Sequence, residues 1–572
     1  MKTLWGEALC PDQILQEYPR PQLRRDDYLI LNGLWDYAIT ADKQMPGDWD
    51  GQILVPFSPE APLSGVERTL LPGQYLWYRR QLTVRPRPGC RVLLHFGAVD
   101  QVTAVFLNGA PVGGHTGGYT AFTLDVTEAL TGEDVLVVRV RDDSDQSPLA
   151  RGKQKTKRGG IWYTPQSGIW QTVWLEQVPE QYIRGLRIVP RYDDSRVEIT
   201  VESGTQAPCA VEFAGQIFAG QTNTPIPVPV PGFRPWSPED PALYDFTAVL
   251  GEDRAESYFA MRKVEVRPDA QGVPRIHLNG RPYFMHGVLD QGYWPDGLYT
   301  APSEEALILD IQSMKNMGFN MLRKHIKTEP MRWYYHCDRL GMLVWQDMPN
   351  GGAEDYQFTT ISVPLVTRRH RKDNDYKAFG REDEKGRRRY YEELTQLVEQ
   401  LRNVPSIVLW CPFNEGWGQF DAAKAVELIQ KLDPDRLIDH ASGWHDQGIG
   451  QLQSLHVYFY KYKFRPDWKG RAVVLSEYGG YNLMIPGHSW NDRNFGYRTL
   501  KSPEALEKAY GKLMLEQVLP AVKQGLSAAV YTQLSDVEDE VNGLWSYDRT
   551  VQKLSTKTLR EINAQLTAGN QV

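Results

Sequence analysis

The spacing of apolar and polar residues divides the chain into two β-rich parts followed by a mixed part. From about residue 25 to 180, short alternating runs such as RVLLHFGAVD and DVLVVRVRD are separated by turn residues. The alternation continues from about residue 181 to 268, for example in RVEITVES and YDFTAVLG. A period of two is typical of strands with one buried face, and closely spaced turns favour two packed sheets. The pattern predicts two successive β-sandwiches, over 1–180 and 181–268.

From residue 269 to 572, apolar strand-like runs alternate with amphipathic helices or long crossovers. The predicted strands are 283–290, 320–325, 342–349, 406–415, 437–442, 454–460, 472–480 and 527–534, and a polar insertion over 350–390 follows the third. This order predicts a (β/α)8 barrel, with a doubly wound sheet as the alternative. In both folds the catalytic groups lie at the C-terminal ends of the strands.

Composition and charge exclude several kinds of partner. The 572 residues carry a net charge of −7, which gives no general attraction to nucleic acid or to anionic membranes. No apolar run reaches the roughly 18 residues of a transmembrane helix, and the N-terminus lacks the apolar region of a secretory signal. The five cysteines are scattered without a CxxC pair. We therefore expect a cytoplasmic protein with free thiols and neither a nucleic-acid nor a membrane partner.

Two carboxylates follow predicted barrel strands. Glu415 comes after the fourth strand in SIVLWCPFNEGWGQF, and Glu477 ends the seventh in AVVLSEYGG. A single glutamate at a strand end more often caps a loop or forms an ion pair. Cleavage of a glycosidic bond, however, requires two carboxyl groups on either side of the sugar. One protonates the leaving oxygen, while the other attacks the anomeric carbon or activates water. A carboxyl separation of about 5–5.5 Å gives retention of configuration and about 6.5–9.5 Å gives inversion.

Most of the chain resembles glycoside hydrolase family 2, the family of β-galactosidases, β-glucuronidases and β-mannosidases. The resemblance rests on NE after the fourth strand and E after the seventh, together with LNGLWDYAI, PQSGIWQTVWLE, IHLNGRPYFMHGV and CDRLGMLVWQDMP. It implies a jelly-roll β-sandwich similar to sugar-binding domains over 1–180, an immunoglobulin-like β-sandwich over 181–268 and a catalytic (β/α)8 TIM barrel over 269–572.

The resemblance also implies roles for individual residues. Glu415 matches the acid/base of the family and Glu477 its nucleophile. Asn414 matches the residue that hydrogen-bonds the sugar 2-hydroxyl, and Tyr458 matches the tyrosine that holds the nucleophile. Arg323 matches an arginine near the nucleophile, with a structural salt bridge at the barrel floor as the alternative.

Four further residues are expected at the pocket from their places on the strands. His456 shares a face with the tyrosine two residues later, and lies either in the pocket or in the core. Trp444, Asp347 and Tyr531 end strands or open their loops, so they are expected as pocket walls. For the two aromatic residues the alternative is packing in the core.

Departures from the family pattern affect two predictions, the presence of a metal site and the identity of the bound sugar. Ile326 stands where β-galactosidases have a histidine, and their magnesium ligands would fall at about Gly351 and Ala353, so neither a metal nor another cofactor is expected. The Asn-x-Lys element with which β-glucuronidases bind a sugar carboxylate is not evident, and Tyr531 replaces the usual tryptophan. Candidates for binding an acidic sugar are Lys324, Lys327 and Arg549.

The predicted function is that of a retaining exo-β-glycosidase, which hydrolyses a terminal sugar from oligosaccharides or glycosides by double displacement. The sequence leaves several terminal sugars as alternatives: galactose, glucuronic or galacturonic acid, and a pentose such as arabinose. Transglycosylation on the same carboxylates and a catalytically inactive carbohydrate-binding protein are the alternatives. A homo-oligomer is also allowed, because large sandwich domains often form subunit contacts, although the sequence shows no interface.

Overall fold

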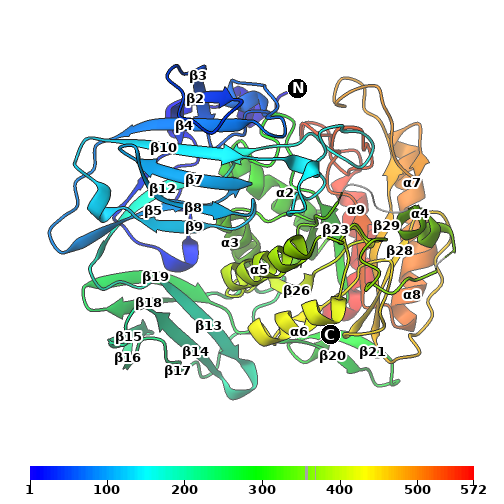
Figure 1. The fold of residues 1–572 in the computed structure, drawn as a ribbon. Coiled ribbons are helices and arrows are strands. Elements are labelled where there is room, and N and C mark those ends of the chain that lie inside the picture. The colour runs from blue at the N-terminus through cyan, green and yellow to red at the C-terminus, as the bar shows by residue number, and fades with distance from the viewer. Residues whose placement is uncertain (354–357, 368, 572) are drawn as a thin grey trace.

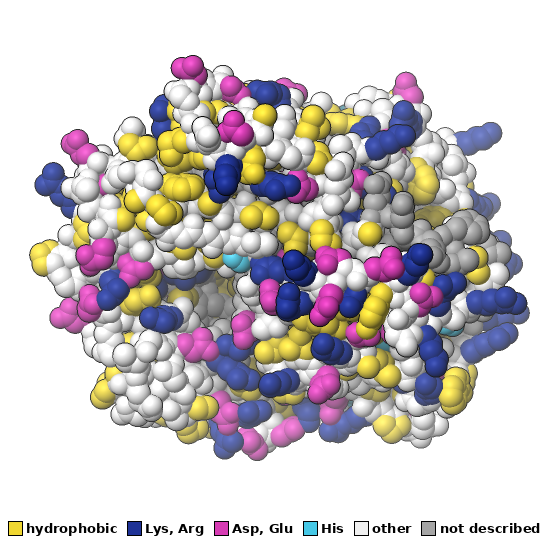
Figure 2. Space-filling view, viewed as in Figure 1, with side chains coloured by type: hydrophobic (Ala, Val, Ile, Leu, Met, Phe, Trp, Pro, Cys, Tyr) yellow, Lys and Arg dark blue, Asp and Glu magenta, His cyan; other side chains and the backbone are white. Residues whose placement is uncertain are grey.

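The computed structural model describes residues 1–353, 358–367 and 369–571. Two groups of β-strands lie along one side of the molecule, with the N-terminal group above the second, and a barrel surrounded by helices occupies the other side (Figure 1). Lys or Arg and Asp or Glu side chains are interspersed over the face seen in Figure 2.

The N-terminal strands form the predicted first sandwich. After a short helix α1 (Leu4–Glu7), a 4-stranded sheet in the order β1-β12-β5-β9 faces a 6-stranded sheet in the order β3-β2-β4-β10-β7-β8. Trp35, Leu94 and Val138 come from both sheets and lie in one apolar core. The strands are β1 Tyr28–Ile30, β2 Gly33–Thr40, β3 Gly51–Val55, β4 Tyr75–Leu82, β5 Cys90–Phe96, β6 Val99–Asp100, β7 Val102–Leu107, β8 Ala110–Thr116, β9 Phe122–Asp125, β10 Asp134–Arg141, β11 Gly168–Ile169 and β12 Val173–Pro179.

A second, smaller sandwich follows. Its 3-stranded sheet β13-β14-β17 packs on a 4-stranded sheet β16-β15-β18-β19, and Val197, Val211 and Phe246 share the core between them. The strands are β13 Gly185–Arg191, β14 Arg196–Glu202, β15 Pro208–Phe213, β16 Gln216–Gln221, β17 Ile226–Pro229, β18 Tyr244–Leu250 and β19 Asp253–Phe259. Three strands, β20 Val264–Pro268, β21 Pro274–Leu278 and β22 Arg281–Pro282, then lead into the barrel.

All eight predicted barrel strands are present and every pair among them is parallel, which confirms the predicted fold class. Their order is β27-β26-β25-β24-β23-β32-β29-β28, a nearly closed barrel with β27 and β28 at the two ends. The strands are β23 Met285–Asp290, β24 Met321–Lys324, β25 Leu343–Asp347, β26 Ile407–Cys411, β27 Leu437–Ile438, β28 Leu452–Val457, β29 Ala472–Gly479 and β32 Ala528–Thr532.

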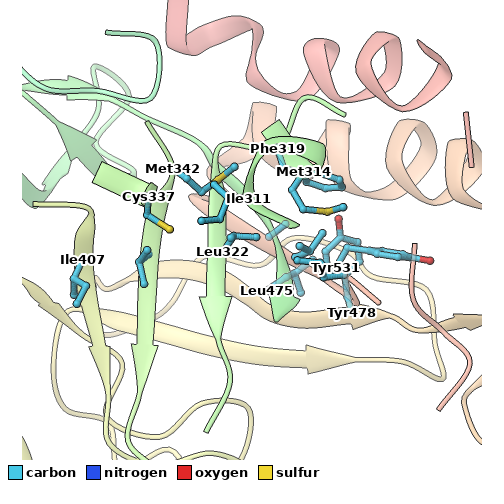
Figure 3. Packing of buried hydrophobic residues seen from close by; sticks show 14 of the residues in the cluster. Ile311, Met314, Phe319, Leu322, Cys337, Met342, Ile407, Leu475, Tyr478 and Tyr531 are labelled. Atoms are coloured by element: carbon cyan, nitrogen blue, oxygen red, sulfur yellow. The ribbon is translucent and has the colours of Figure 1, made fainter. Parts of the chain in front are cut away.

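Strand alternation sends side chains to two separate cores. Met321, Trp345 and Val474 belong to a cluster inside the barrel, together with residues of β20 and β21. Leu322 and Leu475, each one position away from an inward residue, pack outward against the surrounding helices (Figure 3). Because neighbouring positions face opposite sides, one residue along a strand decides between barrel interior and outer core.

Helices cover the outside of the barrel. Ser303 begins α2 by accepting a hydrogen bond from the Ala306 N–H, and Ser502 caps α7 in the same way through Ala505. The strands β27, β28 and β29 follow one another without an α-helix between them in the described chain. The helices are α2 Glu304–Asn316, α3 Met331–Leu340, α4 Phe358–Thr367, α5 Glu384–Leu401, α6 Ala422–Leu432, α7 Pro503–Leu513 with the π-helical turn η7 Met514–Val518, α8 Leu519–Gln524 and α9 Thr556–Thr567; the small strands β30 Tyr481–Asn482 and β31 Arg498–Thr499 follow β29.

None of the helices in the described ranges combines the length and the apolar character needed to cross a bilayer.

Candidate active site

Glu415 and Glu477 emerge at the C-terminal end of the barrel, from β26 and β29. The backbone N–H of Glu415 donates to the Ser442 carbonyl at 2.9 Å, which continues the strand pairing beyond β26. Glu415 has a φ of 52°, in the left-handed region that side-chain-bearing residues rarely adopt, and Gly416 follows with a φ of 72°. Strained backbone of this kind concentrates at functional sites. The local fold therefore turns this carboxyl out of the strand and into the mouth of the barrel.

The two carboxyl groups converge on His456 of β28. The His456 Nδ1 atom lies 2.7 Å from an oxygen of Glu415 and 3.6 Å from an oxygen of Glu477. One oxygen of each carboxyl group and a ring nitrogen of His456 lie within 4.8 Å of one another. The ring of His456 thus faces both carboxyl groups.

Glu477 is surrounded by donors. Its side chain accepts a hydrogen bond from the Tyr458 hydroxyl at 2.5 Å and another from the Arg323 guanidinium at 3.2 Å. Burial by itself raises the pKa of Glu477, but positive neighbours, led by His456 and including Arg323, lower it to about 2. Glu477 is therefore a carboxylate at neutral pH.

Glu415 has the opposite electrostatic character. Burial raises the pKa of Glu415, and the negative charge of Glu477 raises it further, while the hydrogen bond to His456 opposes the rise. The other ring nitrogen of His456 lies 3.1 Å from the Ser442 hydroxyl, which fixes the orientation of the ring. One pocket therefore holds an ionised carboxylate beside a carboxyl group whose pKa is raised.

Arg323 connects the site to the interior of the barrel. Its guanidinium forms two hydrogen bonds of 3.0 Å with Asp347 and one of 2.8 Å with the side-chain oxygen of Asn414. Asp347 also lies 2.9 Å from Nδ1 of His325. Asp347 therefore lies next to the site with its carboxylate occupied by Arg323 and His325 and its side chain 1% exposed, and its role as a pocket wall stays a prediction.

Trp444 lies beside His456, at a ring-centroid distance of 6.3 Å. Both residues line a cavity of about 270 Å³, together with Tyr460 and Lys461. Trp444 therefore lines this cavity, and its role as a wall of the substrate pocket stays a prediction.

Tyr531 does not reach the pocket, and this expectation is corrected. Its ring lies in the outer core, 5.9 Å from the ring of Tyr478 and 5.2 Å from that of Tyr510 (Figure 3). The next residue, Thr532, points the other way and its hydroxyl lies 2.9 Å from the Tyr458 hydroxyl. The alternation of β32 therefore gives the site position to Thr532.

The three cations suggested for an acidic sugar are all paired inside the protein. Lys324 donates to Asp290 and Glu329, at 2.7 and 2.8 Å. Lys327 donates to Glu329 at 2.8 Å and to two carbonyl groups. Arg549 is bound to Asp310, at 3.2 and 3.1 Å, and to two carbonyl groups.

Several residues at the site were not expected from the sequence. Thr532 ends β32 and Ser442 lies in the loop after β27, so their places at the C-terminal ends of barrel strands were the signal that could have found them. Tyr497 stacks on Tyr458 with a ring-centroid distance of 3.7 Å and comes from a long loop after β29. Lys153 comes from the first sandwich and lies beside Trp417, 5.5 Å from its ring. No local sequence pattern predicts such long-range contacts.

Among the residues that the structure describes, Glu415, His456 and Glu477 are the group whose side chains could hold a metal ion. Each already has a partner within the protein, since His456 contacts Glu415 and the carboxylate of Glu477 accepts hydrogen bonds from Tyr458 and Arg323. A bound cation would compete with these contacts.

Comparison with known families finds two matches in this chain. Residues 272–474 match the family model described as "Glycosyl hydrolases family 2, TIM barrel domain". Residues 67–184 match the model described as "Glycosyl hydrolase 2 galactose-binding domain-like". The first match contains Glu415 and the second contains the segment that carries Lys153.

Individual relatives agree with these matches. A putative β-glucuronidase of Formosa agariphila is 26% identical over 404 residues, covering 63% of this chain and 44% of the relative. A β-galactosidase of Thermoanaerobacter pseudethanolicus is 24% identical over 454 residues, covering 73% and 55%. The chain thus spans about half the length of these relatives. The solved β-D-glucuronidase of Dictyoglomus thermophilum has the same fold, with a TM-score of 0.73 at 16% identity over 96% of this chain and 98% of that one.

Proposed function

Because the chain belongs to glycoside hydrolase family 2, we propose that it is a retaining exo-β-glycosidase acting on oligosaccharides or glycosides. The observation that carries this proposal is the pair Glu415 and Glu477. An oxygen of each lies within 4.8 Å of the other, close to the separation of about 5–5.5 Å typical of retaining enzymes and short of the 6.5–9.5 Å of inverting ones. Their pKa values are also shifted in the opposite directions that an acid and a nucleophile need.

In the first step, a carboxylate oxygen of Glu477 attacks the anomeric carbon. The bond from that carbon to the leaving oxygen breaks, and Glu415 donates its proton to this oxygen. The sugar is then held as an ester of Glu477. In the second step, Glu415 takes a proton from a water molecule, whose oxygen attacks the anomeric carbon and releases Glu477. Two inversions leave the sugar with its original configuration.

Neighbouring side chains support each step. Tyr458 and Arg323 hold the Glu477 carboxylate in one orientation and keep it ionised. Asn414 gives its side-chain oxygen to Arg323, which leaves its amide nitrogen buried without a hydrogen-bond partner in the described chain. An amide N–H in this position suits the sugar 2-hydroxyl.

Contacts between the first sandwich and the barrel support action on a terminal sugar. Arg151 and Gly152 donate their backbone N–H groups to the Asn350 carbonyl, at 2.9 and 3.1 Å. Ala150 pairs with Gly351 in a short antiparallel bridge. These residues lie between β10 and β11 and hold part of the sandwich against the rim that carries the carboxylates. A rim closed on one side favours a pocket for one sugar over an open groove.

The proposed substrates are hexosides, uronides or pentosides. A panel of aryl glycosides in both anomers, followed by inactivation with the matching 2-fluoro sugar, tests it. We expect turnover of β-anomers and a covalent label on Glu477. A label on another residue contradicts the assigned nucleophile, and a wild-type protein that turns over no glycoside but binds sugars favours the inactive carbohydrate-binding protein.

The roles of the two glutamates are separated by substitution. We expect Glu477→Ala to abolish turnover, with azide restoring a product of inverted configuration. Glu415→Ala should lose about 10²–10⁴-fold in kcat on substrates with a poor leaving group, with azide giving a product of retained configuration. Exchange of these two azide products between the variants would reverse the assignment.

A further inference from the structure

Lys153 brings a positive charge from the first sandwich to the catalytic pocket. It lies in the segment between β10 and β11, and its side chain is buried, with 5% of the residue exposed. Its ammonium group lies 5.6 Å from the ring centroid of Tyr163 and 5.5 Å from that of Trp417. Trp417 follows Glu415 by two residues, and the charge of Lys153 acts on both Glu415 and Glu477.

The backbone next to Lys153 is fixed to the barrel. Gly152 has a φ of 64°, and a Cβ atom there would lie 2.6 Å from the Tyr299 hydroxyl and 3.0 Å from the Ile326 carbonyl. The carbonyl of Lys153 accepts a hydrogen bond from the Tyr163 N–H at 2.9 Å. Lys153 is therefore held at one place on the rim.

The ammonium of Lys153 differs from other buried cations near the barrel. Within the described ranges it has neither a hydrogen bond nor an ion pair, although it lies over the aromatic rings of Tyr163 and Trp417 and interacts through space with Glu415 and Glu477. By contrast, Arg323, Lys324 and Lys327 each have a carboxylate partner. A buried charge without a partner is costly, so a ligand that supplies the missing anion gains affinity.

A second donor near Lys153 also lacks a partner. The indole nitrogen of Trp417 is buried and makes no hydrogen bond within the described chain. The same holds for the amide nitrogen of Asn414, the residue that precedes Glu415. Unpaired donors around the acid/base are complementary to a ligand rich in acceptor oxygens.

We propose that Lys153 binds the carboxylate of a terminal uronic acid and makes this enzyme selective for β-uronides. The proposal rests on the proposed glycosidase function and names the substrate class of that site. A single ammonium balances the single negative charge of a carboxylate, whereas a sugar phosphate would bring nearly two charges. The cation would come from the first sandwich, and the barrel residues that the sequence suggested for this purpose are already paired.

The test compares uronides with neutral sugars. kcat and KM are measured for p-nitrophenyl β-D-glucuronide and β-D-galacturonide, for the matching glucoside and galactoside, and for a 6-phosphogalactoside. We expect the wild type to prefer a uronide. In Lys153→Met the ratio of kcat/KM for the uronide to that for the neutral glycoside should fall about tenfold to a hundredfold, mainly through KM. Lys153→Arg should restore part of the ratio.

Lys157→Met is the matched control, because Lys157 lies in the same segment but is exposed, and its ratio should equal that of the wild type. Equal losses in Lys153→Met on uronides and neutral glycosides would overturn the proposal and leave Lys153 as an electrostatic support of Glu477. A preference of the wild type for neutral, pentosyl or 6-phospho substrates would overturn it as well.

Failure of the proposed glycosidase function is detected separately. If the wild type turns over no glycoside, calorimetric binding of free glucuronate and galacturonate to wild type and Lys153→Met still tests the contact. Loss of uronate binding in Lys153→Met alone supports the contact without catalysis, and equal binding by both proteins contradicts it.

Discussion

The pKa values of Glu415 and Glu477 are shifted in opposite directions although both residues are buried in one pocket. Burial raises the pKa of any carboxyl group, so the difference comes from the neighbours. The positive neighbours of Glu477, led by His456 and including Arg323, lower its pKa, whereas the negative charge of Glu477 adds to the rise that burial causes in Glu415. The neighbours thus give two glutamates in one pocket opposite pKa shifts without any difference in residue type.

These opposite shifts predict the pH dependence of catalysis. Glu477 must be ionised, and its pKa of about 2 places the loss of activity on acidification far below neutral pH. Glu415 must be protonated, so activity falls as the pH rises through its raised pKa. A profile of kcat/KM against pH should therefore show an alkaline limb, and Glu415→Gln should remove that limb from the remaining activity.

Arg323 supplies the control for this prediction. Arg323→Met removes a positive charge beside Glu477, so the pKa of Glu477 should rise and an acidic limb should enter the measurable range. Arg323→Lys keeps a charge and should shift that limb less. An unchanged acidic side in Arg323→Met would show that Arg323 does not keep Glu477 ionised.

The cluster of Glu415, His456 and Glu477 also allows a test of metal dependence. We propose a metal-independent reaction, because the hydrogen bonds and the charge of Arg323 already perform the tasks that an ion would take over. Dialysis against a chelator should leave kcat and KM unchanged, and addition of Zn²⁺ should inhibit by competing for these side chains. Loss of activity on dialysis, with recovery on addition of one divalent ion, would contradict this view.

Strand β32 shows how one position along an element separates stability from catalysis. Tyr531 packs in the outer core and Thr532 contacts Tyr458, although the two residues are neighbours. Tyr531→Ala should destabilise the protein by about 3–5 kcal/mol, since it removes a buried ring. Its kcat at low temperature should stay near that of the wild type.

Thr532→Val is the paired variant. It keeps the shape of the side chain but removes the hydroxyl next to Tyr458, so it should lower kcat with a loss of stability of about 0.5–1.5 kcal/mol. Denaturant unfolding and steady-state kinetics of both variants check the prediction. A larger catalytic loss in Tyr531→Ala than in Thr532→Val would place the tyrosine in the site after all.

The contact between the first sandwich and the barrel is a property of the whole molecule. At Gly152 a Cβ atom would meet Tyr299 and the Ile326 carbonyl, so Gly152→Ala should push the segment of Lys153 away from the rim. We expect the KM for glycosides to rise severalfold. The barrel should stay folded, because Gly152 lies between β10 and β11, outside the barrel strands. Kinetics together with circular dichroism measure both quantities.

Gly109→Ala is the matched control for the backbone strain. Gly109 also has a positive φ, of 81°, but no atom lies within 4 Å of its added Cβ. The two variants share the strain of a left-handed alanine and differ in the contact with the barrel. Equal KM values in both would mean that this contact does not shape the pocket.

The order of strands and helices in the barrel was predictable, while the ends of its elements were less so. The sequence predicted a polar insertion over 350–390, but α5 already begins inside it at Glu384, where Asp383 caps the first turn. Asp347 was expected at the pocket because it ends β25, yet its carboxylate is taken by Arg323 from the neighbouring strand. The identity of a partner on another strand has no local signal.

The sequence by itself determined the two sandwiches, the eight strands and the candidate carboxylates, because alternation and strand ends are local properties of the chain. The tertiary structure decided which neighbours meet: His456 between Glu415 and Glu477, Tyr531 turned outward, and Lys153 carried from the first sandwich to the barrel rim. Charge and hydrogen bonding act over a few ångströms in space. Residues far apart in the sequence therefore determine the chemistry of the site, whereas the local pattern shows only where the candidate carboxylates lie.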